Sequence, residues 1–337
     1  MKQQSVIVFG ATGGVGAYTS LYLKDKGYNV IAVGKRNSDN DFFRDYDINY
    51  YAVDISKKES FKELPREDIY AVIHLAGSLP ARMKNYNPQE YIDANITGTL
   101  NVLEYSRSVN IEKFVFATTL ADVYHLCGST DLIDPDSIRK FPKNTDHSVY
   151  TITKNAAIDL IQHYSYKYNF NPFIIRFANV FLYHPNPYYF VNGVKKGKGL
   201  YNIIEQAKRG EDIELWGDPT RTRDAFYVKD CTQLLEKCIS SKSQGGVYNV
   251  GTGIGTSRKE QIKNIIEVFS PNDQISKIVY RPDLPDSPQF MLDISKNIKE
   301  LNYIPQYDYL AFLKDFKLEM ESNVFEKLWG TESDYIK

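Results

Sequence analysis

Short apolar runs alternate with segments of helical periodicity through the first half of the chain. SVIVFG (5–10) and NVIAVG (29–34) are apolar and rich in β-branched residues, and the segment 13–27 between them has helical spacing and ends in glycine. Strand, helix and strand in this order predict a βαβ unit, which requires a parallel sheet. The alternation continues with strands predicted at 50–55, 70–77, 113–119 and 171–180 and helices at 91–108 and 150–168. The pattern therefore predicts an α/β fold of the Rossmann type, with a doubly wound parallel sheet.

The pattern changes after residue 180. Two prolines and three glycines fall between residues 185 and 199, with lysines among them. This composition predicts a loop-rich segment near a ligand rather than another βα repeat, and a last helix is expected at about 307–329. We expect residues 1–180 to form a dinucleotide-binding domain that also receives parts of about 223–250. Residues 181–337 should form mainly a smaller α/β substrate-binding domain.

Composition narrows the class of protein. A net charge of −1 over 337 residues argues against nucleic-acid binding, which usually needs a basic excess. The three cysteines lack CxxC spacing, so they predict neither a disulfide framework nor a structural zinc site, and we expect no bound metal. No apolar segment is long enough to span a bilayer. We expect a cytoplasmic protein with no membrane partner.

A glycine turn joins the first predicted strand to the first helix. GATGGVG places Gly10, Gly13 and Gly16 where backbone N–H groups and a helix N-terminus can approach a pyrophosphate. The same pattern can be an ordinary tight turn. Its position between a strand and a helix favours dinucleotide binding.

The end of the second strand bears on the choice of cofactor. NAD-binding folds usually have an acidic residue there for the adenosine ribose, whereas this chain has Gly34, Lys35 and Arg36. Two cations beside a glycine suit a 2′-phosphate, so NADP is favoured over NAD. A solvated basic turn is the alternative, and Asp39 could still serve NAD. Asp54 is a candidate for contact with the adenine.

Tyr150 and Lys154 are spaced i and i+4, so both project from one face of a helix. A neighbouring ammonium and an oxidised nicotinamide both favour phenolate, and so lower the pKa of a tyrosine that acts as a base. Tyr22 and Lys26 have the same spacing, which we interpret as a chance surface pair. Only Tyr150 and Lys154 follow the strand that ends near Thr119.

Several motifs occur in a familiar order. After the glycine turn come HLAG (74–77), NITGTLNVLE (95–104), DVY (122–124), YTITK (150–154), RFANVF (176–181) and RDAFYVKD (223–230). With these motifs the chain resembles the extended short-chain dehydrogenase/reductase family, and more narrowly its nucleotide-sugar epimerases and dehydratases. The resemblance implies a nicotinamide cofactor on the N-terminal domain and a nucleoside-diphosphate sugar in the cleft beneath the C-terminal one.

The resemblance also implies roles for individual residues. The cofactor contacts that it implies are Gly10, Thr12, Gly13, Val15, Gly16, Lys35, Arg36, Asp54, Ile55, Leu75, Ala76, Gly77, Asn95 and Lys154. The substrate contacts are Asn179, Leu200, Trp216, Arg223, Arg281 and Asp286. Asn179 would contact the diphosphate or sugar, and Arg223 and Arg281 would pair with the diphosphate. For Leu200, Trp216 and Asp286, packing or surface solvation is an equal alternative.

The segment FATTLADVYH (116–125) departs from the family. Relatives have a Ser or Thr four residues before the tyrosine of this motif, and counting back from Tyr124 reaches Leu120. Leucine cannot hydrogen-bond a sugar oxygen, so either Thr119 is the third catalytic residue through a one-residue shift, or this donor is lacking. Dehydratases have an Asp and Glu pair after the threonine. Here Ala121 and Asp122 replace it, which disfavours dehydration.

Three hypotheses for function remain. The first is an epimerase acting at C4 of a nucleoside-diphosphate sugar, with Tyr150 taking the O4 proton while C4 gives a hydride to the cofactor. The second is an NADPH-dependent 4-keto-sugar reductase. The third, motivated by Leu120, is a cofactor-binding protein without catalysis. The resemblance also implies a homodimer packed through the helices near 95–108 and 150–168, and we interpret His125 and His147 as solvated loop residues.

Overall fold

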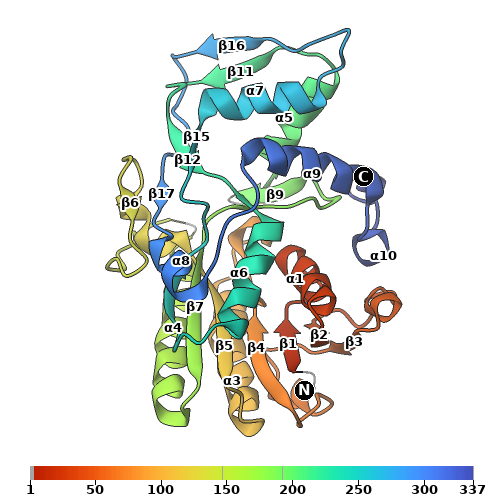
Figure 1. Ribbon diagram of the computed structural model, residues 1–337, viewed down its shortest axis with the longest axis vertical. Helices are drawn as coiled ribbons and strands as arrows, with labels where there is room; N and C mark the ends of the chain where they lie inside the picture. Colours follow the sequence, from red (N-terminus) through yellow and green to blue (C-terminus); the bar gives the residue numbers. More distant parts are fainter. Residues whose placement is uncertain (1–3, 146, 192, 337) are drawn as a thin grey trace.

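The computed structural model describes residues 4–145, 147–191 and 193–336, and a seven-stranded sheet is its largest element (Figure 1). The strand order is β14-β7-β5-β4-β1-β2-β3, and every neighbouring pair is parallel. Its strands are β1 (Ser5–Phe9), β2 (Asn29–Gly34), β3 (Asn49–Ala52), β4 (Ile69–His74), β5 (Lys113–Thr119), β7 (Asn171–Phe177) and β14 (Gly246–Asn249). The predicted Rossmann-type sheet is therefore confirmed.

Both faces of the sheet are buried. Alternate residues of β1 point to opposite sides, so Val6 and Val8 join one apolar core while Ile7 and Phe9 join another. Helices α1 (Gly14–Asp25) and α6 (Val228–Ser240) pack together on the first side, and α3 (Gly98–Ser108) and α4 (Ser148–Tyr168) on the second. The chain reverses direction across the sheet between β1 and β4. Doubly wound folds bind ligands at the carboxyl ends of the strands beside such a point.

The chain after residue 180 forms short, paired strands and separate helices. The two-stranded sheets are small: β9 pairs with β10, β11 with β16, β12 with β15, β13 with β8, and β17 with β6, a strand that comes before residue 180. The strands are β6 (Leu132–Ile133), β8 (Val180–Phe181), β9 (Tyr188–Val191), β10 (Val194–Gly197), β11 (Ile213–Trp216), β12 (Thr222–Asp224), β13 (Phe226–Tyr227), β15 (Gly255–Ser257), β16 (Ile278–Arg281) and β17 (Met291–Leu292). The remaining helices are α2 (Pro88–Tyr91), α5 (Gly199–Lys208), α7 (Arg258–Phe269), α8 (Ser295–Leu301), α9 (Tyr309–Ser322) and α10 (Glu326–Trp329).

The expectation of one last helix over 307–329 is wrong. Asn323 adopts a left-handed conformation with φ of 39°, which ends α9, and the chain turns before α10 begins. The turn brings the short helix α10 back toward the N-terminal half, beside α1 and β2 (Figure 1).

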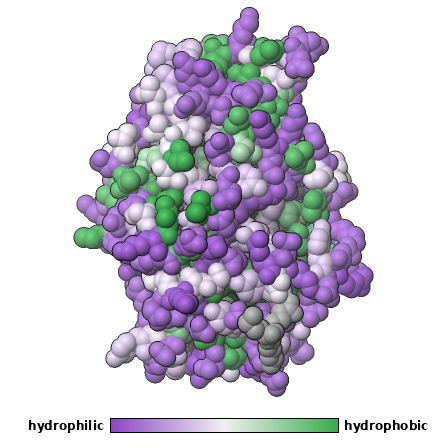
Figure 2. All heavy atoms as spheres, in the orientation of Figure 1, coloured by the Kyte–Doolittle hydropathy of each residue, from purple (hydrophilic) through white to green (hydrophobic). Residues whose placement is uncertain are grey.

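The outer surface is largely polar. On the face drawn in Figure 2, apolar residues form separate patches among hydrophilic ones. Among the described residues, no helix has the length and apolar character needed to cross a membrane.

Candidate active site

Thr119 and Leu120 point to opposite environments at the end of β5. The Thr119 side chain accepts a hydrogen bond from the backbone N–H of Ala121 at 3.1 Å, and its hydroxyl is close enough to Tyr150 to lower the pKa of that tyrosine. Leu120 is buried, in a small apolar cluster with Val123, Ile133, Phe290 and Leu292. The extra residue in this segment therefore directs a leucine into the core and leaves a hydroxyl beside the tyrosine.

Asp122 forms a buried ion pair with Arg176. Its buried carboxylate accepts from Arg176 Nε at 2.9 Å, and the same guanidinium donates to the Pro135 carbonyl at 2.8 Å. Burial raises the pKa of Asp122, and the Arg176 charge opposes that shift. Removing one partner of such a buried pair leaves an uncompensated charge. Asp122 is thus a structural residue here and not a base available to a sugar.

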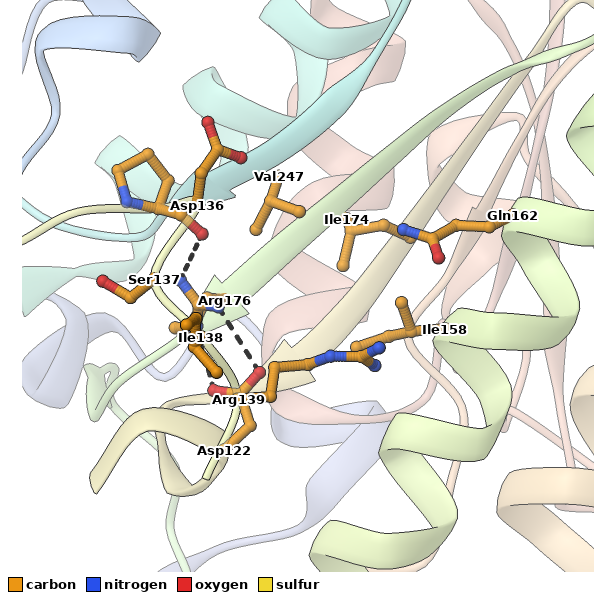
Figure 3. Close-up of a pocket in the computed structure, with 11 residues that line it drawn as sticks. Asp122, Asp136, Ser137, Ile138, Arg139, Ile158, Gln162, Ile174, Arg176 and Val247 are labelled. Atoms are coloured by element: carbon orange, nitrogen blue, oxygen red, sulfur yellow. Dashed lines mark hydrogen bonds and ion pairs between the residues drawn. The ribbon is translucent and has the colours of Figure 1, made fainter. Parts of the chain in front are cut away.

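The buried ion pair also forms one wall of a cavity of about 420 Å³ (Figure 3). Its other walls come from loop residues 135–139, from Ile158 and Gln162 of α4, and from Ile174 and Val247 in strands of the large sheet. Arg139 itself donates to Asn155 and Asp159. None of the residues expected from the sequence to contact cofactor or substrate lines this cavity, so we place the reaction elsewhere.

Tyr150 is buried near the N-terminus of α4. Its ring lies 6.2 Å from that of Tyr91 and 6.4 Å, edge to face, from that of His147. Burial raises the pKa of Tyr150 to about 12, and the hydrogen bond from Thr119 opposes this shift. The tyrosine is therefore protonated at neutral pH in the ligand-free protein, and it can act as a base only when further positive charge comes close.

Lys154 lies one turn further along α4, beneath the sheet edge. Its ammonium donates to the Ala117 carbonyl at 2.8 Å and lies 4.4 Å from the centre of the Phe116 ring. Burial lowers the pKa of Lys154 to about 7. The same charge, together with burial, lowers the pKa of His74 to about 3, so that histidine is neutral.

Asn95 is placed next to Lys154 by an irregular helix turn. Residues Ile92–Thr97 form a π-helical segment between α2 and α3, a feature frequent at functional sites. The Asn95 amide donates to Thr153 at 3.1 Å and accepts from the Ser78 N–H at 3.0 Å. A Cβ on Gly77 would lie 2.6 Å from the Asn95 oxygen. Gly77, Asn95 and Lys154 thus form one tightly packed group.

The glycine turn has no room for side chains. A Cβ on Gly16 would lie 2.1 Å from the Gly10 carbonyl oxygen, and one on Gly10 would lie 2.8 Å from the Ala76 nitrogen, next to Leu75. Gly10 also has φ of +90°, which glycine adopts readily. Val15 lies in the first turn of α1 and packs partly against the core. The turn therefore brings β1, α1 and the end of β4 into backbone contact.

The side chains that follow β2 already have partners. Lys35 forms an ion pair with Asp54 at 3.3 Å, although most of its side chain is exposed. Arg36 donates to the Leu328 carbonyl at 2.6 Å. The buried Asp39 carboxylate accepts from the Phe43 N–H. The buried Ile55 follows Asp54, and its carbonyl accepts from Asn101.

The C-terminal residues that pack on the glycine turn were missed by the sequence analysis. Trp329 donates from its indole nitrogen to the Thr12 carbonyl at 3.0 Å and stacks on His184 with ring centres 4.6 Å apart. Phe325 packs against Tyr18 and Phe42. No local motif predicts these contacts, because the residues are about 300 positions apart. We call residues 325–335 the C-terminal clasp.

The residues expected to bind substrate fall into two groups. Asn179 precedes β8, which pairs with β13, and the Arg223 guanidinium lies 5.6 Å from the ring of Phe181 in β8. Trp216 and Arg281 are opposite each other on β11 and β16. Leu200, on α5, is partly buried and packs against the apolar core.

Arg281 and Asp286 do not have free charges. Arg281 donates to Glu214 at 2.7 Å, and Glu214 also accepts from the Trp216 indole. Asp286 accepts from the Asp218 N–H at 2.8 Å and pairs with Arg221 at 3.4 Å. The expectation that Arg281 pairs with a diphosphate stays a prediction, because its ion pair with Glu214 is partly exposed.

The two histidines near the tyrosine differ from each other. His125 is exposed, and one of its ring nitrogens hydrogen-bonds the Lys140 carbonyl at 2.8 Å. His147 is exposed as well, but its ring packs edge-on against Tyr150. His147 is thus part of the surroundings of the tyrosine.

Comparisons with known proteins identify the family of this chain. Residues 6–251 match the model of the NAD dependent epimerase/dehydratase family. A UDP-glucuronate 4-epimerase of Thermodesulfobacterium geofontis is 28% identical over 91% of this chain and 93% of its own length. The solved UDP-glucose 4-epimerase of Thermotoga maritima, with UDP-glucose, has a TM-score of 0.75 and 23% identity, covering 94% of this chain and 100% of that one.

A second solved structure is the UDP-glucuronic acid 4-epimerase from Bacillus cereus in complex with UDP-glucuronic acid and NAD. It has a TM-score of 0.69 and 21% identity, covering 94% of this chain and 100% of that one. The match to the family model runs from the first strand of the seven-stranded sheet to its last, β14. The protein belongs to the NAD-dependent epimerase/dehydratase family within the extended short-chain dehydrogenases/reductases, as its motifs indicated.

Proposed function

We propose that this protein is a nicotinamide-dependent 4-epimerase of a nucleoside-diphosphate sugar. The observation that carries the proposal is the placement of Thr119 beside Tyr150, where it lowers the pKa of the phenol, with Lys154 one helical turn away on the same face of α4. The related proteins support the substrate class, since they are named as 4-epimerases of UDP-glucose or UDP-glucuronate.

Each of the three residues has a distinct role in the proposed reaction. Tyr150 takes the proton from the sugar O4 and later returns it, and Thr119 hydrogen-bonds the same oxygen. A bound nicotinamide would accept the hydride from C4 of the sugar and would return it after the keto sugar has rotated. Lys154 holds the cofactor ribose and adds the positive charge that Tyr150 needs to ionise.

We further propose that the two predicted domains bind different ligands. Residues 1–180, with parts of about 223–250, hold the cofactor, and residues 181–337 mainly hold the sugar nucleotide. The glycine turn supports the first part of this proposal, because backbone groups there can approach a pyrophosphate closely. The cation of Arg223 supports the second.

NADP as the preferred cofactor is a narrower proposal. The exposed ammonium of Lys35 supports it, since a 2′-phosphate can compete with Asp54 for that charge. Arg36 supports it less, because its guanidinium is bonded to the Leu328 carbonyl. The related epimerase solved with NAD supports the unphosphorylated cofactor. Comparing the dissociation constants of NAD and NADP decides between them.

We also propose a cytoplasmic homodimer packed through α3 and α4. Ile152 and Tyr166 on α4 are 43% and 90% exposed, which supports a partner for this helix. Three free cysteines support a reducing compartment.

The test of the function is conversion of UDP-glucose or UDP-glucuronate to its 4-epimer by the purified protein, followed by chromatography. We expect turnover without net oxidation of cofactor. Tyr150→Phe should lower kcat by roughly 10³-fold and Thr119→Val by about 10²-fold, because one loses the base and the other a donor to the reacting oxygen.

Matched controls separate these roles from folding. Tyr22→Phe removes the hydroxyl of the other Tyr-Lys pair and should leave kcat unchanged. Leu120→Ala should lower the free energy of unfolding by about 2–5 kcal/mol with kcat largely retained. Full activity of Tyr150→Phe would contradict the mechanism. Consumption of NADPH in proportion to product would instead identify a 4-keto-sugar reductase.

A further inference from the structure

The C-terminal clasp presents main-chain carbonyls to the segment that follows β2. The last carbonyls of a helix have no partner within the helix, so other groups must supply one. At the end of α10, the Lys327 carbonyl accepts from the Asn40 amide at 2.8 Å, and the Leu328 carbonyl accepts from the Arg36 guanidinium at 2.6 Å. Side chains from beside β2 therefore complete the end of a helix that is about 290 positions away in the chain (Figure 1).

Two buried aromatic side chains fix the position of this helix end. Phe325 and Trp329 stack with ring centres 4.3 Å apart, and both pack against Tyr18 of α1. The Trp329 indole also donates to the Thr12 carbonyl at 3.0 Å. A Cβ on Gly34, the last residue of β2, would lie 2.8 Å from the Thr12 side chain. The glycine turn, the end of β2 and the C-terminal clasp thus form one packed unit.

Arg36 has no acidic partner within the part of the chain that the structure describes. Its exposed side chain donates to the Leu328 carbonyl instead. The neighbouring Lys35 differs, because its ammonium is paired with Asp54 at 3.3 Å. The phenol of Tyr50 donates to the Arg36 carbonyl at 2.5 Å, which fixes the main chain at this residue. Arg36 is therefore the cation of this turn that no carboxylate balances.

The position of Arg36 bears on the one group that distinguishes NADP from NAD, the 2′-phosphate. In dinucleotide-binding folds an arginine near the end of the second strand accommodates this phosphate, and the fork of a guanidinium suits its oxygens. A carbonyl at the end of a helix carries partial negative charge. The Leu328 carbonyl therefore competes with a phosphate for Arg36 and also repels it.

We propose that the C-terminal clasp sets the selectivity of the cofactor site, by holding Arg36 on the Leu328 carbonyl and so weakening the binding of NADP relative to NAD. This inference rests on the proposed function for the class of cofactor. It does not depend on which cofactor binds more tightly overall, because the Lys35 ammonium can still favour a 2′-phosphate. Release of the C-terminal clasp frees Arg36, and the affinity for NADP then rises relative to that for NAD.

Calorimetric titration of the full-length, cofactor-free protein with NAD and with NADP tests the proposal through the ratio of the two dissociation constants. Trp329→Ala removes the aromatic anchor and should shift this ratio at least fivefold in favour of NADP. Arg36→Gln, whose amide can still donate to the Leu328 carbonyl, should shift the ratio less than twofold in the otherwise intact chain. Combined with Trp329→Ala, it should cancel the gain. Lys327→Met is the control, because it loses an exposed ion pair with Asp45 but keeps the main-chain carbonyls, and it should leave the ratio unchanged.

The outcomes separate the inference from the function. If Trp329→Ala melts as a folded protein and leaves the ratio unchanged, the C-terminal clasp does not set selectivity, while epimerase activity stands. If Arg36→Gln alone weakens NADP binding fivefold or more, Arg36 already contacts the 2′-phosphate and the inference is wrong. That measurement leaves the C-terminal clasp intact, so it decides the question even if Trp329→Ala does not fold. If the wild type binds neither dinucleotide and epimerises no sugar nucleotide, both the inference and the proposed function are wrong.

Discussion

The carboxyl edge of the seven-stranded sheet and the chain after residue 180 hold polar groups in different ways. At the sheet edge the contacts are between backbone atoms or buried side chains, as at Gly10, Asn95 and Lys154. After residue 180 many contacts are ion pairs between partly exposed side chains, such as Arg281 with Glu214 and Lys208 with Glu205.

The difference has an energetic consequence. A buried polar group that loses its partner destabilises the fold by the full free energy of its desolvation. An exposed ion pair, in contrast, contributes only about 0–1 kcal/mol to the stability of the fold. Substitutions at the sheet edge should therefore have large effects on stability and cofactor binding together. Those in the later part should have small and graded effects, except where charge is buried without a partner, as at Arg223.

The largest effect on stability is expected at Lys154. Burial lowers its pKa from 10.5 to about 7, so between pH 7 and 10.5 the unfolded chain binds a proton that the folded protein does not. The free energy of unfolding therefore rises with pH across that window. Below pH 7 the lysine is charged in both states, and the full cost of burying the charge lowers the stability. Lys154→Met should remove this slope and stabilise the cofactor-free protein at pH 6 by at most about 5 kcal/mol.

Urea unfolding of cofactor-free protein from pH 6 to 9.5 measures this slope. Lys208→Met removes an ammonium that is exposed beside Glu205 and should leave the pH profile as in the wild type. If Lys154→Met and the wild type show parallel profiles, the ammonium is not desolvated in the way that the contact with Ala117 and Phe116 indicates.

Alanine substitutions at Gly16 and Gly199 should differ, because one glycine lies in the tightly packed turn and the other is in open space. Gly16→Ala places a Cβ against the Gly10 carbonyl, so we expect it to lower the free energy of unfolding by about 3 kcal/mol and to weaken cofactor binding at least tenfold. Gly199→Ala, at the start of α5, meets no atom within 4 Å and should be neutral. Equal melting temperatures for the two variants would show that the turn can relax around a side chain.

The sequence predicted six of the seven strands of the large sheet, because most of them are apolar runs, but it did not predict β14, the short strand GVYN. The helix period alone placed Tyr150 and Lys154 on one face of α4. The burial of Leu120 in an apolar cluster could not be predicted from the sequence, because its partners Phe290 and Leu292 are distant in the chain.

The smallest effect is expected where the two regions touch, at Trp329. Trp329→Phe keeps an aromatic ring against His184 and Phe325 but loses the hydrogen bond to the Thr12 carbonyl. A single hydrogen bond contributes about 1 kcal/mol, so the dissociation constant of the cofactor should rise about fivefold by fluorescence titration. Tyr335→Phe, which loses a donor to the Trp329 carbonyl further from the turn, should have a weaker effect. If Trp329→Phe lowers the melting temperature without changing cofactor affinity, the C-terminal clasp packs against the glycine turn without helping to hold it in its binding conformation.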